Sequence, residues 1–87
     1  MIDNPHVDNN GNERWYDECG RLHRDDQPAV IFWNGCQKWY DRGLLHRIDG
    51  PACWWNADDV EYWINGVHLT EDEFKFQSFL LRGLNKA

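Results

Sequence analysis

The strongest constraint on the fold is an internal repeat with a period of 23 residues. The segment GRLHRDDQPAVIFWNGCQKWY, residues 20–40, aligns without gaps with GLLHRIDGPACWWNADDVEYW, residues 43–63. The two copies share Gly, Leu, His, Arg, Asp, Pro and Ala, and three further positions keep an aromatic ring. Unrelated segments of ordinary composition would share only about one or two residues over this length. Such a repeat predicts stacked copies of one small unit.

A diverged copy precedes these two. IDNPHV at residues 2–7 is similar to IDGPAC at residues 48–53, and GNERWY at residues 11–16 is similar to GCQKWY at residues 35–40. The chain has 87 residues, which is the size of one small domain. We therefore expect a single domain over residues 1–87, with repeat units at approximately 2–20, 21–43 and 44–66.

Each unit has the pattern of a β-hairpin. PAVIF and CQKWYD are rich in β-branched and aromatic residues and flank the turn signal WNG, and ACWWN and VEYWI flank ADD in the same way. The turns DRG and ING then lead into the short segments LLHR and VHLT. The expected fold class is mostly β: an antiparallel meander of repeated hairpins, about three 23-residue units, with one C-terminal helix packed on it.

The C-terminal segment predicts this helix over residues 71–82. Thr70 and Glu73 form a capping box, and Gly83 followed by Leu84 predicts the end, with Leu84 set against Phe79. Aromatic residues on both sides of the strands indicate that the sheet needs a cover. We expect the helix to cover one face through an apolar stripe of Phe74, Phe76, Phe79 and Leu80.

The pattern WY-x-x-G-x-x-HR-x-DGPA, carried by Trp39–Ala52, resembles MORN-type repeats. It is most similar to the HR-x-DGPA variant that recurs in small proteins of bacteriophages and large DNA viruses, and NGVHLTEDEF is similar to the tail that closes such arrays. The resemblance implies a ribbon of antiparallel hairpins that contacts protein, in some members lipid, and it implies no catalytic residues. The middle copy departs from the pattern at Gln27, where Gly is expected, which predicts a looser turn.

The repeated turn residues have two interpretations. They are His23, Arg24 and Asp26 in one copy, and His46, Arg47, Asp49, Gly50 and Pro51 in the next. A catalytic set is needed once, whereas a structural set is needed in every unit, so we interpret these residues as structural. A catalytic His–Asp pair would also need a nucleophile, and the one serine, Ser78, falls on the predicted helix. We expect no enzymatic activity.

Metal and cofactor sites are also not expected. Cys19, Cys36 and Cys53 are spaced 17 residues apart, so no C-x₂₋₄-C motif is present and the cysteines fall at different points of the repeat. An odd number of cysteines without a signal peptide is typical of free thiols in a reducing cytosol. We expect a cytoplasmic protein, in the host cytoplasm if the chain is viral.

Charge limits the partners. The net charge of −6 disfavours direct binding to nucleic acid and to an anionic membrane, and it favours a basic protein partner. The candidate partner-binding residues are Trp33, Trp54, Trp39, Asp41, Asp58, Asp59 and Glu61. The leading hypothesis is a non-enzymatic protein-binding module, such as a phage-encoded inhibitor of a host defence or nucleic-acid-processing protein. A self-associating structural repeat protein and a small ligand-binding protein that uses the His-Arg-Asp turns remain as alternatives.

Overall fold

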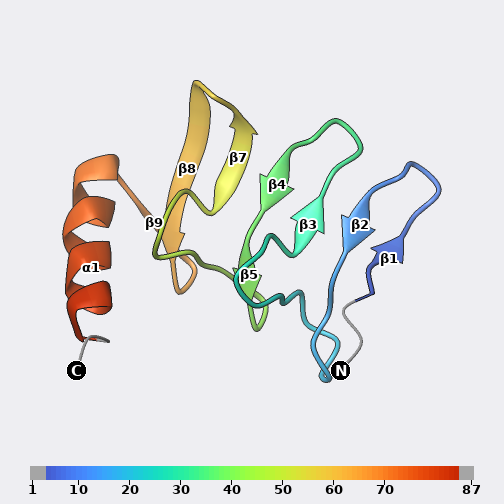
Figure 1. Cartoon of the computed structure of the whole chain (residues 1–87), viewed down its shortest axis with the longest axis horizontal. Coiled ribbons are helices and arrows are strands. Elements are labelled where there is room, and N and C mark those ends of the chain that lie inside the picture. The colour runs from blue at the N-terminus through green and yellow to red at the C-terminus, as the bar shows by residue number, and fades with distance from the viewer. Residues whose placement is uncertain (1–3, 85–87) are drawn as a thin grey trace.

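The computed structural model describes residues 4–84 and consists of short β-strands followed by one helix (Figure 1). The predicted fold class is confirmed. The strands are β1 (His6–Val7), β2 (Glu13–Arg14), β3 (Val30–Ile31), β4 (Gln37–Lys38), β5 (Tyr40–Asp41), β6 (Leu44–Leu45), β7 (Cys53–Asn56), β8 (Asp59–Ile64) and β9 (Val67–Leu69), and the helix is α1 (Glu71–Leu84).

The strands form a meander in which sequence neighbours lie side by side. One sheet has the order β1-β2-β3-β4-β7-β8-β9, with every neighbouring pair antiparallel, and β5 and β6 form a separate hairpin. The Cα extents of 39 × 32 × 18 Å describe a thin slab. In Figure 1 the turns of the β1–β2, β3–β4 and β7–β8 hairpins all lie along one margin, and the β5–β6 hairpin lies at the opposite margin.

The turn between β3 and β4 follows the WNG signal. The Gly35 N–H donates to the Phe32 carbonyl at 2.9 Å, the Phe32 N–H donates to the Cys36 carbonyl at 2.9 Å, and Gly35 has φ of 92°. This is a three-residue hairpin loop with glycine in the left-handed region. The Trp33 N–H also donates to Asn12 Oδ1 at 2.9 Å, which ties the loop to the neighbouring hairpin.

The first hairpin makes the same backbone turn and adds a carboxylate to it. The Gly11 N–H donates to the Asp8 carbonyl at 3.1 Å, and Gly11 has φ of 87°. Asp8 Oδ1 accepts from the backbone N–H groups of Asn10 and Asn12 at 2.9 and 3.0 Å, and Asp8 Oδ2 accepts from the Arg14 guanidinium at 2.9 Å. These bonds, the one from Arg14 first, hold the pKa of the Asp8 carboxyl well below its ordinary value of 3.8. The diverged copy therefore keeps the same backbone turn and adds side-chain bonds to it.

The core runs along the sheet rather than between layers. Ala29 and Ala52 occupy the same repeat position and are both 0% exposed, and the adjacent Val30 and Cys53 are 3% and 1% exposed. Burial raises the pKa of the Cys53 thiol to about 11. The small alanine that follows each proline allows the next unit to pack closely against the strand.

The helix begins where the capping box predicts and ends later than expected. The Glu73 N–H donates to Thr70 Oγ1 at 3.1 Å, and the Thr70 N–H donates to Glu73 Oε1 at 2.9 Å. The helix continues through Gly83 to Leu84, so Gly83 does not end it. We expected the Leu84 side chain to contact Phe79, but the structure describes only the backbone of Leu84.

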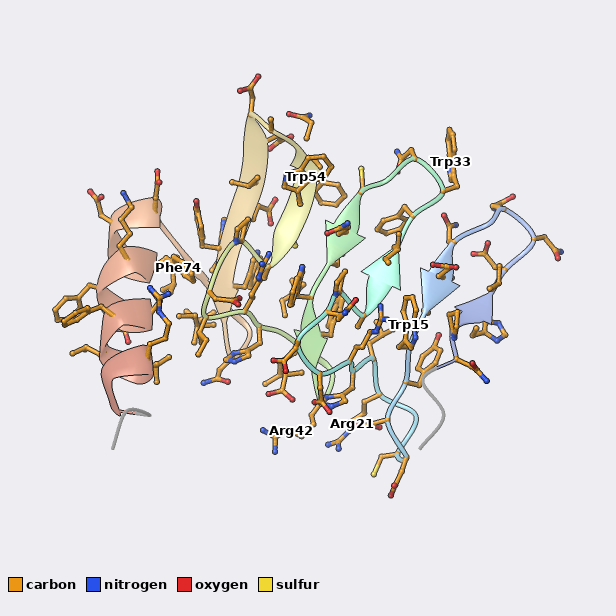
Figure 2. All side chains as sticks on the ribbon, viewed as in Figure 1. Trp15, Arg21, Trp33, Arg42, Trp54 and Phe74 are labelled. Carbon is orange, nitrogen blue, oxygen red and sulfur yellow. The ribbon has the colours of Figure 1, made fainter. Side chains whose placement is uncertain are left out.

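The predicted sheet-facing stripe of the helix is confirmed for Phe74 and wrong for Phe76, Phe79 and Leu80. Phe74 is 7% exposed and Ser78 is 2% exposed, whereas Phe76 and Phe79 are 63% and 70% exposed. The helix contacts β8 and β9, at the end of the sheet, and does not cover a whole face (Figures 1 and 2). The small Ser78 side chain allows close approach to the strands, and its Oγ lies 3.4 Å from the Lys75 carbonyl, which accepts its hydrogen bond.

Candidate functional site

Each repeated histidine holds a turn of its own unit. The Arg42 N–H donates to His23 Nδ1 at 3.0 Å, and the Asn65 N–H donates to His46 Nδ1 at 3.0 Å. Arg42 and Asn65 have φ of 50° and 51° and each precedes a glycine with positive φ, which is the backbone of a tight hairpin turn. Because Nδ1 accepts, the neutral imidazole carries its proton on Nε2. The imidazoles therefore act here as hydrogen-bond partners of the backbone.

Each repeated arginine covers an aromatic ring of the preceding unit. The guanidinium carbon of Arg24 lies 3.8 Å from the centroid of the Trp15 ring, and that of Arg47 lies 3.7 Å from the Trp39 ring. Arg47 Nε donates to Asp49 Oδ1 at 2.8 Å, and Arg47 Nη1 donates to the Pro51 carbonyl at 3.2 Å. Arg47 therefore contacts Trp39, Asp49 and Pro51 of its own chain.

The helix completes this series of stacked pairs. Tyr62 takes the position of Trp39 in the last unit, and Thr70 stands where an arginine would follow. The Phe74 ring stacks on Tyr62 instead, with centroids 4.6 Å apart and an interplanar angle of 30°. The helix thus supplies the cover that the next repeat would have provided, as terminal units of repeat arrays must.

The His-Arg-Asp turn that contains Gly50 and the one that contains Gln27 differ in backbone conformation. Gly50 does not have positive φ, so its role in the turn is not to supply a left-handed conformation. A Cβ at Gly50 would lie 2.8 Å from the guanidinium carbon of Arg47, so the glycine is needed for close approach. In the other copy Gln27 stands at this position, and Asp26 takes φ of 58°. The change of residue therefore accompanies a rearranged turn.

A pocket of about 610 Å³ lies between the turns. It is lined by residues of both His-Arg-Asp turns, by Trp39 and Tyr40, and by Arg82 of the helix. Among the described residues neither a serine nor a cysteine lines this pocket, so it presents no nucleophile of the usual kind. The lining holds more Asp than Arg side chains, and one of the arginines, Arg47, already binds Asp49.

A second, smaller hollow lies at the hairpin turns. It has a volume of about 160 Å³ and is lined by Phe32, Trp33, Asn34, Cys36 and Trp55. Lys38 places its ammonium 5.9 Å from the Phe32 ring and 5.1 Å from the Trp55 ring. Phe32 and Trp55 were missing from our candidate list, although their shared repeat position with a conserved aromatic character was a usable signal. We call the hollow together with Trp54, Asp58 and Asp59 the tip surface.

The candidate partner-binding residues fall in different places. Trp33 is 73% exposed and Trp54 is 37% exposed, and both lie toward the hairpin-turn margin in Figure 2. Asp58 and Asp59 are exposed at the adjacent β7–β8 turn. The tip surface therefore brings four of the candidates to one margin of the molecule.

The other three candidates lie elsewhere. Trp39 lies under Arg47, and its ring N–H is buried without a hydrogen-bond partner among the described residues. Asp41 accepts from Arg42 at 3.1 Å in the β5–β6 hairpin. Glu61 Oε1 accepts from Trp63 Nε1 at 3.0 Å, and this bond is the main cause of the lowered pKa of the Glu61 carboxyl. These contacts give the three residues partners within the chain.

Within residues 4–84, no group of three or more His, Cys, Asp or Glu side chains is arranged to hold a metal ion, and no helix is long and apolar enough to cross a membrane. Comparison with protein-family models, curated proteins and solved structures found no match. The similarity to MORN-type repeats therefore stays a hypothesis that the sequence motifs alone support.

Proposed function

We propose that this chain is a non-enzymatic protein-binding module and that the tip surface binds the partner. The observation that carries the proposal is the exposure of Trp33, which presents 73% of its surface from a turn whose backbone is fixed. Exposed aromatic side chains on a rigid backbone are typical anchors of protein interfaces, because they bury much area at a small cost in conformational entropy. No contact within the described fold accounts for this exposed ring.

Charge defines the class of partner. The chain carries a net charge of −6, and Asp58 and Asp59 are exposed at the turn that follows β7, the strand that carries Trp55. A basic groove that normally holds nucleic acid would complement this combination of acidic rim and aromatic centre. We therefore propose a nucleic-acid-binding protein of a bacterial host as the partner, which the module would inhibit by occupying its groove in the cytoplasm. The free thiols Cys19, Cys36 and Cys53 suit that reducing compartment.

The test is a comparative capture from lysate of the bacterial host. Wild-type chain, a Trp33→Ala variant and an Arg42→Asn variant are immobilised in equal amounts, and retained proteins are quantified by mass spectrometry. We expect a basic protein that the wild type and Arg42→Asn retain and that Trp33→Ala loses. Duplex DNA added in excess should release it, because both would occupy the same groove. A partner retained equally by all three chains would contradict the proposed surface.

A second candidate function is binding of a small polar molecule in the pocket between the turns. Arg82 favours it, because this exposed side chain lines the pocket from the helix and can donate hydrogen bonds to a polar group of a ligand. An Arg82→Gln variant removes that charge. If a ligand occupies this pocket, its binding should weaken in Arg82→Gln and be unchanged in Trp33→Ala.

A further inference from the structure

The outward face of α1 is an apolar seam that no described part of the chain covers. Phe76, Phe79 and Leu80 are 63%, 70% and 42% exposed, whereas Phe74 on the opposite side is 7% exposed. With Gly83, the three exposed residues follow the spacing i, i+3, i+4, i+7, which places them in one row along the helix. Exposed apolar rows of this kind are typical of helix–helix contacts.

We propose that this seam binds the same seam of a second copy, with the two helices antiparallel. A two-fold axis that passes between Phe79 and Leu80 sets Phe79 of each copy beside Leu80 of the other, and it sets Phe76 opposite Gly83. Apart from the adjacent residues and the nearby helix backbone, no described atom lies within 4 Å of the position that a Cβ would take at Gly83. One of the two phenylalanines of the seam therefore meets the position with no side chain, a size relation that favours close packing.

Charge favours the antiparallel arrangement over a parallel one. The first turn of α1 carries Glu71, Asp72 and Glu73, and its last turn carries Arg82. An antiparallel pair keeps the two acidic turns apart and opposes the two helix dipoles. A parallel pair would instead align acidic turns with each other.

The size of the seam determines how tight the dimer is. Aromatic side chains bury about 150–250 Å² each, so this seam buries a few hundred Å² on each copy. That area is below the roughly 800 Å² per partner of a stable interface. The dimer should therefore be weak and depend on concentration. Because the seam lies on the helix and not at the hairpin turns, this inference is independent of the proposed function (Figure 1).

Sedimentation velocity of the purified full chain, from about 1 µM to about 1 mM, tests the proposal over the range expected for a small interface. The wild type should change from monomer to dimer as concentration rises. Phe79→Glu should stay monomeric throughout. The matched control Trp33→Glu places the same charge on an equally exposed aromatic outside the seam and should dimerise like the wild type. A wild type that stays monomeric throughout, or a dimer that Phe79→Glu leaves unchanged, would overturn the proposal.

Gly83→Leu tests the register without disturbing the fold. Leucine is a better helix former than glycine, so the melting temperature measured at low concentration should stay the same or rise. The added side chain would fill the place that Phe76 occupies in the partner, so the dimer should weaken by about tenfold or more. A dimer as tight as that of the wild type would contradict the antiparallel register.

Discussion

Replacement of Arg47 by methionine should destabilise the fold by about 1.5–3 kcal/mol. The change keeps a long side chain and removes the stack on Trp39, worth about 0.5–1 kcal/mol for a partly exposed pair. It also removes the bond to the Pro51 carbonyl, worth about 1–1.5 kcal/mol. The pair with Asp49 adds about 0.5 kcal/mol or less, since that carboxylate is 61% exposed.

This loss is a large part of the total stability. An 87-residue domain has a free energy of unfolding of about 4–13 kcal/mol at the usual 0.05–0.15 kcal/mol per residue. At about 4–8 °C per kcal/mol, the melting temperature of Arg47→Met should fall by about 6–24 °C in thermal circular dichroism. Arg47→Lys should recover less than half of this loss, because an ammonium lacks the planar guanidinium group.

The control is Arg42→Asn. The Arg42 side chain is 69% exposed and pairs with the adjacent Asp41, and its φ of 50° is one that asparagine tolerates. Its melting temperature should shift by about 4 °C or less, since surface changes alter stability by about 0.5 kcal/mol at most. If Arg47→Met melts with the wild type, the stacked pairs do not hold the units together and the structural interpretation of the repeated turns fails.

The other predictions concern the helix, the thiols and acid. Phe74→Ala should destabilise the chain by about 3–5 kcal/mol in urea unfolding at low protein concentration, whereas Phe79→Ala should change it by about 0.5 kcal/mol or less; equal effects would contradict the assigned helix faces. A thiol reagent at mildly alkaline pH should modify exposed Cys19 in the native chain and reach Cys53 only after denaturation, because Cys53 is buried with a pKa raised to about 11; peptide mapping distinguishes them. Because folding lowers the pKa of the Asp8 carboxyl below its ordinary value of 3.8, this group stabilises the fold at neutral pH. The contribution is lost as the pH falls below about 4. Asp8→Asn should therefore be less stable than the wild type at neutral pH and show a shallower decline in acid, and parallel declines would contradict this role.

The fold could be predicted because the repeat and its turns are local signals. The WNG segment places Gly35 where a hairpin loop needs positive φ, and the capping box at Thr70 sets the start of the helix within one residue. These features depend on backbone geometry over a few residues, so the sequence carries them without knowledge of the packing.

The packing of the helix could not be predicted in the same way. Apolar residues occupy both sides of α1, and Phe74 and Phe76 project in different directions, so periodicity alone favours neither face. The outcome depends on Tyr62, which needs a ring to cover it, and on Ser78, which is small enough for close contact. Both are properties of the assembled sheet end. Because the buried row contains the polar residue Ser78, the sequence pattern favoured the more apolar row of Phe76, Phe79 and Leu80 as the buried face.

The stacking of arginine on the ring of the preceding unit was also missed. Arg47 follows Trp39 by eight residues and Arg24 follows Trp15 by nine, so the pairs do not share one fixed spacing. The extra residue lies in the Asp17–Arg21 turn, where Asp17 N–H donates to the Arg21 carbonyl at 2.8 Å. An insertion accommodated by a turn hides the pairing from an ungapped alignment.

The central claim, that the chain binds a protein through its tip surface, is tested most directly by titration calorimetry. The captured partner is titrated with the wild type and with Trp33→Ala at matched salt concentration. We predict that the Kd rises by about 30-fold or more for Trp33→Ala, as for a hot-spot aromatic residue, while its melting temperature stays that of the wild type. An unchanged Kd for Trp33→Ala would contradict the claim.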